Sequence, residues 1–67
     1  MDNNTLKGQW NDMKNSVKQK WSEMTDDDMD HVNGDRDRLV GRVQDRYGRS
    51  REDAEREVDD WRRDNNY

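Results

Sequence analysis

The fold is decided by the stretch Leu39-Val40-Gly41-Arg42-Val43-Gln44-Asp45-Arg46-Tyr47-Gly48, where the C-terminal half of the chain concentrates its apolar side chains. Its four large apolar residues share a helical face about 100° wide; they are Leu39, Val40, Val43 and Tyr47. The spacing predicts a helix from Asp35 to Tyr47, ended by Gly48 because glycine adopts left-handed backbone without strain. Gly41 inside this helix costs about 1 kcal/mol relative to alanine, which we explain by the close approach of a neighbouring helix or a tryptophan ring.

An apolar stripe along the first segment is the natural cover for that stretch. Its members are three or four residues apart: Leu6, Trp10, Met13, Val17, Trp21 and Met24. Side chains at this spacing lie on one face of a helix, so the pattern predicts a helix from about Asn4 to Met24. A stripe this narrow is typical of a core seam rather than of a surface that binds a partner.

Two further helices are indicated by their start signals. Thr25 followed by Asp28 resembles a capping box with aspartate in place of the usual glutamate, and it opens a short helix that ends at Asn33-Gly34. The apolar edge of this helix is Met29 and Val32. Ser50 followed by Asp53 has the same spacing and opens a last helix, whose apolar edge is Ala54, Val58 and Trp61.

These segments predict a small all-α fold within one domain, residues 1–67. Helices joined by turns this short pack against their sequence neighbours, so we expect about four helices arranged as two helical hairpins. No alternating apolar pattern indicates a strand. The predicted structural core is Trp10, Met13, Val17, Trp21, Met29, Leu39, Val40, Val43, Tyr47, Val58 and Trp61.

Composition limits the classes of protein to which the chain can belong. Charged residues make up 45% of the chain and apolar residues 25%, a mixture that leans towards disorder. The net charge is only −4, however, and the apolar residues are large and regularly spaced, which favours a folded helical domain. Without cysteine the chain has no disulfide. No apolar run is long enough for a signal peptide or a membrane span, so we expect a soluble, cytoplasmic protein without a membrane partner.

The sequence gives little support for catalysis or for a metal site. The run Asp26-x-Asp28-x-Asp30 resembles the start of a calcium loop, but His31 stands where that loop needs glycine and Asp37 where it needs glutamate. The start of a helix explains the same carboxylates. His31 has no serine or cysteine nucleophile at a suitable spacing. We therefore expect no catalytic residue, cofactor or metal ion, and no enzymatic activity.

A nucleic-acid contact is an alternative function. Its candidate residues are the arginines around the third helix: Arg38, Arg42, Arg46 and Arg49. A helix pair with a tight turn superficially resembles a helix-turn-helix. The acidic balance of the chain opposes strong binding to phosphates, which scales with the number of basic groups presented. Solvated faces carrying ion pairs are the favoured interpretation of these residues.

Several motifs together resemble the CsbD-like family of small bacterial stress proteins. The N-terminal half contributes Lys7-Gly8-x-Trp10, Val17-Lys18, Trp21 and Thr25-Asp26-Asp27-Asp28. The C-terminal half contributes the run from Gly34 to Gly48 and then Ala54-Glu55-x-Glu57-Val58-x-x-Trp61. The resemblance implies two crossing helical hairpins, in the manner of a sterile-alpha-motif-like bundle. It also implies a role in the general stress response, and it carries no catalytic residue, cofactor or ligand.

The leading hypothesis is therefore a non-enzymatic stress-response protein that acts through protein contacts or as a hydrated, highly charged protectant. Besides nucleic-acid binding, a third hypothesis is an oligomeric interaction domain that uses tryptophan surfaces left uncovered. A monomer or a weak oligomer with an unidentified protein partner fits the chain. Burial of Trp10, Trp21 and Trp61 separates these views, because three buried rings mean a self-sufficient core.

Overall fold

The computed structural model describes residues 9–65, and within them the chain forms four α-helices. They are α1 (Trp10–Lys20), α2 (Asp26–Val32), α3 (Arg36–Tyr47) and α4 (Arg51–Asp64). The prediction of a small all-α fold is confirmed.

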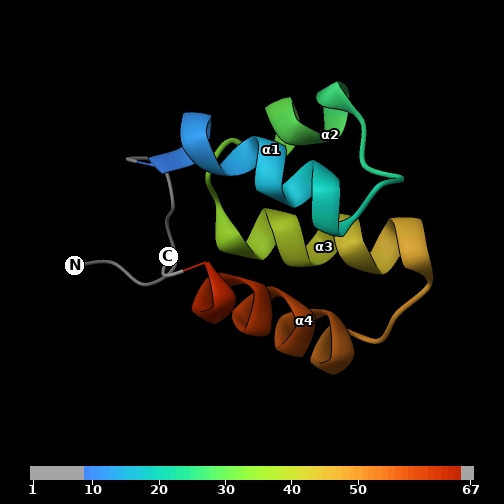
Figure 1. Ribbon diagram of the computed structural model, residues 1–67. Helices are drawn as coiled ribbons and strands as arrows, with labels where there is room; N and C mark the ends of the chain where they lie inside the picture. The colour runs from blue at the N-terminus through green and yellow to red at the C-terminus, as the bar shows by residue number, and fades with distance from the viewer. Residues whose placement is uncertain (1–8, 66–67) are drawn as a thin grey trace.

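Helix α3 lies at the centre of the arrangement (Figure 1). Helices α1 and α2 lie on one side of it and α4 lies on the other. Helices α3 and α4 run antiparallel, joined by the short turn at Gly48, and α3 also packs against α2. The stretch from Leu39 to Gly48 is thus covered from two sides.

The helix ends follow from local sequence. Thr25 and Asp28 form a complete capping box: Thr25 Oγ1 accepts from Asp28 N at 3.2 Å, and Asp28 Oδ2 accepts from Thr25 N at 3.0 Å. Asn33 ends α2 in the left-handed region at φ 43°. Ser50 accepts a hydrogen bond from Asp53 N at the start of α4. Gly48 ends α3 at φ 63°, as predicted.

Helix α1 is shorter than predicted. It ends at Lys20 rather than at Met24, and its predicted start near Asn4, together with Leu6, lies outside the described residues. Trp21 leaves the helical region with ψ 84°, and a turn bonded from Met24 N to Trp21 O leads to the cap of α2. Met24 is nevertheless buried, because the turn folds its side chain back into the core.

One continuous core joins the helices. Each predicted core residue is buried except Tyr47, which is half-buried and packs against the core; Met24, Val32 and Ala54 complete it. The three tryptophans retain only 7% (Trp10), 2% (Trp21) and 3% (Trp61) of their exposure. Burying rings of this size supplies much of the apolar contribution to stability in so short a chain.

The predicted role of Gly41 is wrong. A Cβ atom placed on Gly41 would meet nothing within 4 Å outside its own helix, so neither a neighbouring helix nor a tryptophan ring approaches it. The glycine lies at a half-buried position of α3 where the covering elements leave open space.

Candidate functional site

The most distinctive polar feature is a buried carboxylate between α2 and α3. Asp28 is the buried charged residue within residues 9–65, and its side chain is 3% exposed. Arg46 donates a hydrogen bond to each of its oxygens, from Nε to Oδ2 at 2.9 Å and from Nη2 to Oδ1 at 3.1 Å. Arg42 lies one helical turn earlier, with Nη1 3.7 Å from Oδ1. Two arginines of α3 therefore converge on one carboxylate of α2.

This environment keeps Asp28 ionised. The hydrogen bond from Arg46 is the largest influence and lowers the pKa of Asp28 below its ordinary value of 3.8. Burial acts in the opposite direction, and the backbone N–H of Thr25 adds to the lowering. The same pairing raises the pKa of Arg46. The two groups form a stable ion pair at neutral pH, with Arg42 as a second cation beside them.

The other two candidate arginines also contact the protein itself. Arg38 donates from Nη1 to the backbone oxygen of His31 at 3.3 Å. Arg49 pairs with Glu57 of α4, and its guanidinium lies 5.8 Å from the centre of the Tyr47 ring. Arg38 and Arg49 are still exposed, but each already has an intramolecular partner.

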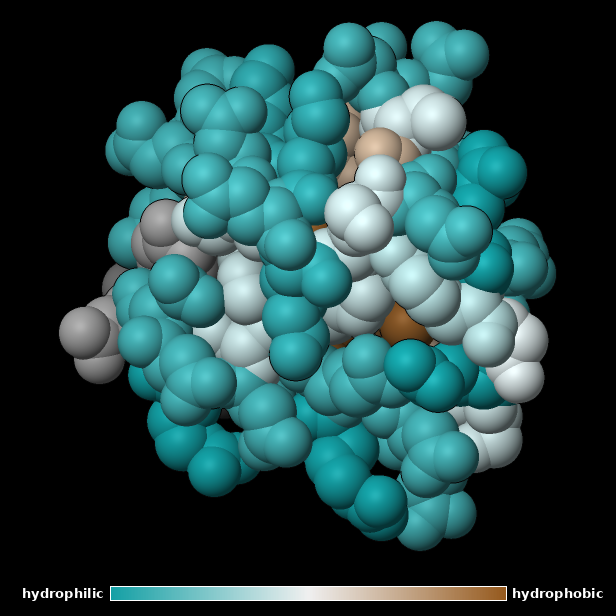
Figure 2. All heavy atoms as spheres, turned by 45° about the vertical axis from the view of Figure 1, so that its right-hand side comes forward, coloured by the Kyte–Doolittle hydropathy of each residue, from teal (hydrophilic) through white to brown (hydrophobic). Residues whose placement is uncertain are grey.

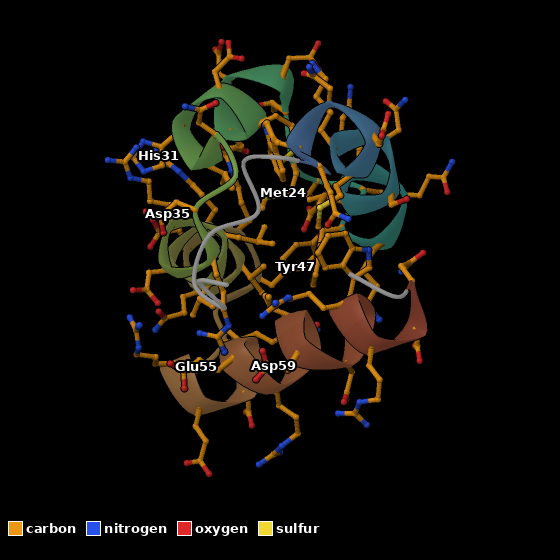
Figure 3. All side chains as sticks on the ribbon, turned by 90° about the vertical axis from the view of Figure 1, so that its left-hand side faces the viewer. Met24, His31, Asp35, Tyr47, Glu55 and Asp59 are labelled. Carbon is orange, nitrogen blue, oxygen red and sulfur yellow. The ribbon has the colours of Figure 1, made fainter. Side chains whose placement is uncertain are left out.

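A second polar seam joins the turn after α1 to the C-terminal hairpin. The hydroxyl of Tyr47 accepts from Glu23 N at 3.0 Å, and Trp21 Nε1 donates to Glu57 Oε1 at 3.3 Å. The ring of Trp21 meets that of Trp61 at 5.7 Å between centroids and an interplanar angle of 60°. Figure 3 shows Tyr47 and Met24 directed into the space between the two hairpins.

The arginines of the predicted nucleic-acid surface thus mainly form ion pairs and hydrogen bonds within the protein itself. Arg42 and Arg46 are brought together at Asp28, while Arg38 and Arg49 contact separate partners. Sequence reasoning identified Asp28 as a cap residue but missed its burial and its arginine partners. The sequence offered one signal for this burial, namely aspartate in place of the usual glutamate at the third helical position. The short side chain of aspartate holds the carboxylate close to the helix.

The acidic run at the start of α2 does not gather a metal site. Asp28 faces α3, Asp26 pairs with Lys18 of α1 at 2.6 Å, and Asp30 is exposed. No group of three metal-ligating side chains occurs among the described residues. His31 projects from the outer side of α2 into solvent (Figure 3).

Comparison with known proteins places this sequence in a family. The CsbD-like family model matches residues 4–56. The chain belongs to the CsbD-like family. It is 45% identical to the UPF0337 protein YjbJ of Salmonella typhimurium over the whole chain and 96% of that relative. It is also 45% identical to YjbJ of Escherichia coli K12, again over the whole chain and 97% of the relative.

A more distant CsbD-like relative comes from Pseudomonas aeruginosa. The UPF0337 protein PA4738 is 41% identical over 61 residues, which cover 91% of this chain and 94% of the relative. CsbD-like membership is consistent with a role in the general stress response. Among the helices of the described region, none is both long and apolar enough to cross a membrane.

Proposed function

We propose that this CsbD-like protein is a non-enzymatic stress-response protein that acts as a folded, highly charged protectant in the cytoplasm. The family assignment supports the stress role. The distribution of apolar and charged side chains over the fold favours the protectant mode over binding to a dedicated protein partner.

The observation that supports the protectant mode is the absence of an apolar docking patch within residues 9–65. Every apolar side chain in this range is buried except Tyr47, which is half-buried. Figure 2 shows one face of the molecule on which hydrophilic residues surround a band of residues of intermediate hydropathy, while hydrophobic atoms are visible only in small gaps. Protein–protein interfaces are usually centred on exposed aromatic or aliphatic anchors, and this region offers no such anchor.

The charged surface is also largely self-neutralising. Seven arginines form ion pairs within the described residues: Arg36, Arg42, Arg46, Arg49, Arg51, Arg56 and Arg63. Apart from the pairs of Arg42 and Arg46 with buried Asp28, these ion pairs are exposed and add little stability. They do hold many hydrated groups of both signs on the surface while the net charge stays at −4. Such a surface binds water strongly and resists association through apolar contacts.

The mechanism that follows is physical separation of vulnerable molecules. Unfolding proteins aggregate through exposed apolar surface. A small, hydrated protein that offers no apolar contact can occupy the space between them as water becomes scarce. This mode needs high concentration and no defined stoichiometry, whereas a contact-dependent mode saturates at a fixed ratio to the partner.

A drying assay with a labile enzyme tests this proposal. The enzyme is dried and rehydrated with increasing amounts of the protein, and its remaining activity is measured. We expect protection that rises gradually with mass concentration and exceeds that of an equal mass of a globular protein of ordinary composition. Saturation near one molecule per enzyme would contradict the protectant mode and support direct contacts.

A charge-depleted variant provides the matched comparison. Six exposed residues are changed together, three of each sign: Lys14→Gln, Arg56→Gln, Arg63→Gln, Asp30→Asn, Glu52→Gln and Asp60→Asn. The net charge is unchanged, and the exposed ion pairs removed are each worth less than about 1 kcal/mol. Circular dichroism checks that the helices persist. Protection should fall clearly in this variant, and full protection would sink the proposal.

A further inference from the structure

The turn that follows α2 contains a chemically reactive pair of residues, Asn33 and Gly34. It is the one asparagine–glycine pair in the chain, and Asn33 is exposed to water. In such a pair the backbone nitrogen of the glycine can attack the carbon of the asparagine side-chain amide. Glycine has no Cβ atom to hinder the approach and gives the backbone the freedom that the attack needs. The pair is therefore a candidate for spontaneous deamidation.

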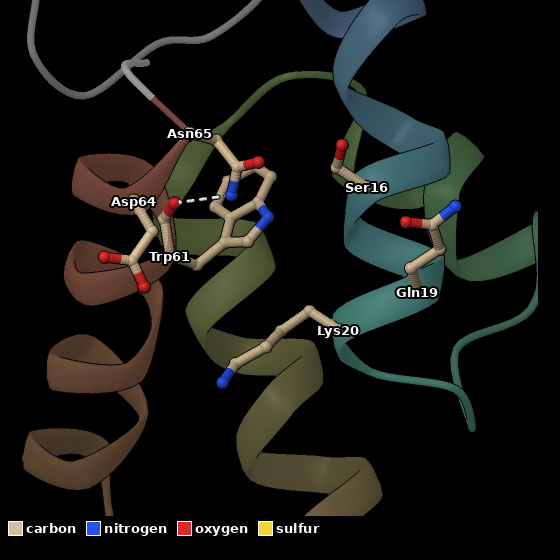
Figure 4. Close-up of a pocket in the computed structure, with 6 residues that line it drawn as sticks. All are labelled: Ser16, Gln19, Lys20, Trp61, Asp64 and Asn65. Atoms are coloured by element: carbon tan, nitrogen blue, oxygen red, sulfur yellow. Dashed lines mark hydrogen bonds between the residues drawn. The ribbon is translucent and has the colours of Figure 1, made fainter.

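The other asparagines of the described region lack this combination. Asn11 and Asn15 lie inside α1 and precede aspartate and serine. Asn65 donates from Nδ2 to the Trp61 backbone oxygen at 2.9 Å (Figure 4), which fixes the orientation of its amide. The amide of Asn33 forms no hydrogen bond with a residue in the range 9–65, so it is available to react.

The folded turn holds the pair in a shape that prevents the attack. Asn33 has φ 43° and ψ 43°. At this ψ value the Gly34 nitrogen lies on the far side of the Cα–C bond from the Asn33 Cβ atom, so it cannot reach the amide carbon. Asn33 N donates to the Met29 oxygen at 2.9 Å. Asp35 N donates to the Val32 oxygen at 2.8 Å, and together these bonds fix the turn. The reaction thus requires that the turn opens.

Opening of the turn depends on the docking of α2. This helix has seven residues, too few for a stable isolated helix. Arg46 of α3 holds it through two hydrogen bonds to Asp28. When these contacts are lost, the helix melts, its last backbone hydrogen bonds break, and the Gly34 nitrogen becomes free to rotate towards the Asn33 side chain.

We propose that Asn33 is a spontaneous deamidation site that the left-handed turn protects and that undocking of α2 exposes. The Gly34 nitrogen forms a bond to Asn33 Cγ, the Cγ–Nδ2 bond breaks, and ammonia leaves with the proton of the Gly34 N–H. Water then opens the cyclic imide at either carbonyl, which gives aspartate or isoaspartate. Water is the only co-reactant. This site does not depend on the proposed protectant role.

The products make the modification a lasting record of opening. Both place a carboxylate at the C-terminal end of α2, where the helix dipole disfavours it. Isoaspartate also adds a methylene group to the backbone, so the hydrogen bond from residue 33 to the Met29 oxygen loses its geometry. The end of α2 is therefore less stable after the reaction than before it.

Tryptic peptide mapping after incubation at mildly alkaline pH tests the site. Peptide 21–36 contains Asn33 as its single asparagine, and peptide 15–18 contains Asn15 as an internal reference. In guanidinium chloride, Asn33 should convert to both acidic products faster than Asn15 does. In the folded protein, Asn33 should convert at least about tenfold more slowly than in guanidinium chloride. Equal rates in the two conditions would overturn the protection, and no conversion in guanidinium chloride would overturn the site.

A pair of glycine variants tests the attacking nitrogen. Gly34→Ala is measured in guanidinium chloride, so that its ability to fold does not matter, and should slow the conversion of Asn33 severalfold because the new Cβ atom hinders the attack. Gly41→Ala is the matched control and should leave the rate unchanged. Equal rates in the two variants would contradict attack by the Gly34 nitrogen.

A pair of arginine variants tests the link to undocking in the folded protein. Arg46→Gln should speed up the conversion of Asn33 by about tenfold, because α2 loses two charge-assisted hydrogen bonds from α3. Arg63→Gln removes an exposed arginine that pairs within α4 and should leave the rate unchanged. Equal rates in these two variants would refute the dependence on the docking of α2.

Discussion

Asp28 and Arg46 form a two-pronged ion pair that fastens α2 to α3, with donor–acceptor distances of 2.9 and 3.1 Å. The carboxylate is buried and the guanidinium is 42% exposed. The pair therefore lies at the edge of the core, where water is excluded from one partner only. Among the polar contacts between the two hairpins in residues 9–65, it is the one that involves a buried charge.

Replacing Asp28 by asparagine should destabilise the fold by about 2 to 4 kcal/mol, because it weakens the cap of α2 and leaves two arginines without their counter-ion. Urea unfolding followed by tryptophan fluorescence measures the change. Asp27→Asn is the matched control, since Asp27 lies in the same helical turn but is exposed. Equal losses in the two variants would mean that helix-end electrostatics, and not the ion pair, account for the effect.

The contribution of Asp28 should disappear in acid. Its pKa is lower in the folded state than the ordinary value of 3.8, so its stabilisation is complete above the unfolded pKa and is lost as pH falls through the folded one. Urea unfolding between pH 7 and pH 2 should show the free-energy difference between wild type and Asp28→Asn shrinking below about pH 4. A difference that stays constant down to pH 2 would contradict this assignment.

Gly41→Ala should stabilise the protein by up to about 1 kcal/mol, because alanine is the better helix former and its methyl group enters open space. Gly48→Ala makes the contrasting case. Its left-handed backbone, at φ 63°, costs a residue with a Cβ atom about 1 to 2 kcal/mol. Thermal unfolding should move in opposite directions for the two variants. A loss of stability in Gly41→Ala would reveal a close contact with α3.

Nucleic-acid binding through α3 should be weak and non-specific. Arg42 and Arg46 already neutralise Asp28, and the chain as a whole is acidic, so few cations remain to displace counterions from DNA. Duplex DNA titrated at low and at moderate salt should show no tight complex. Tight binding that weakens steeply with salt, and that is lost on changing Arg42 and Arg46 to alanine, would establish the alternative function.

Burial of all three tryptophans predicts a monomer. Their emission should be blue-shifted and poorly quenched by acrylamide, and light scattering should give one mass across a concentration series. The oligomeric hypothesis required uncovered tryptophan surfaces, and residues 9–65 leave none of the three rings exposed. A mass that grows with concentration would show that another surface mediates association.

Local signals predicted the parts of the fold that local chemistry decides. The capping residues Thr25 and Ser50 and the stop at Gly48 each act within four residues, so the sequence alone carries them. The end of α1 is different. The apolar spacing continues through Trp21 to Met24, but the helix ends at Lys20 and the chain turns towards α2.

The contacts between the two hairpins could not be predicted from the sequence, because they depend on how the helices pack against each other. Asp28 and Arg46 are 18 positions apart, and their meeting depends on how α2 docks on α3. The arginine spacing of α3 looked like a basic surface because a pattern does not reveal which charges already have partners. Gly41 was misassigned because space around a helix depends on the elements that cover it.

The double role of Asp28 has a consequence for how the molecule assembles. Seven residues are too few for a stable isolated helix, and α2 has this length. The carboxylate that closes its first turn is the same one that Arg46 holds. Starting the helix and docking it are therefore one event, so α2 should gain its structure only together with α3 and lose it at the same moment.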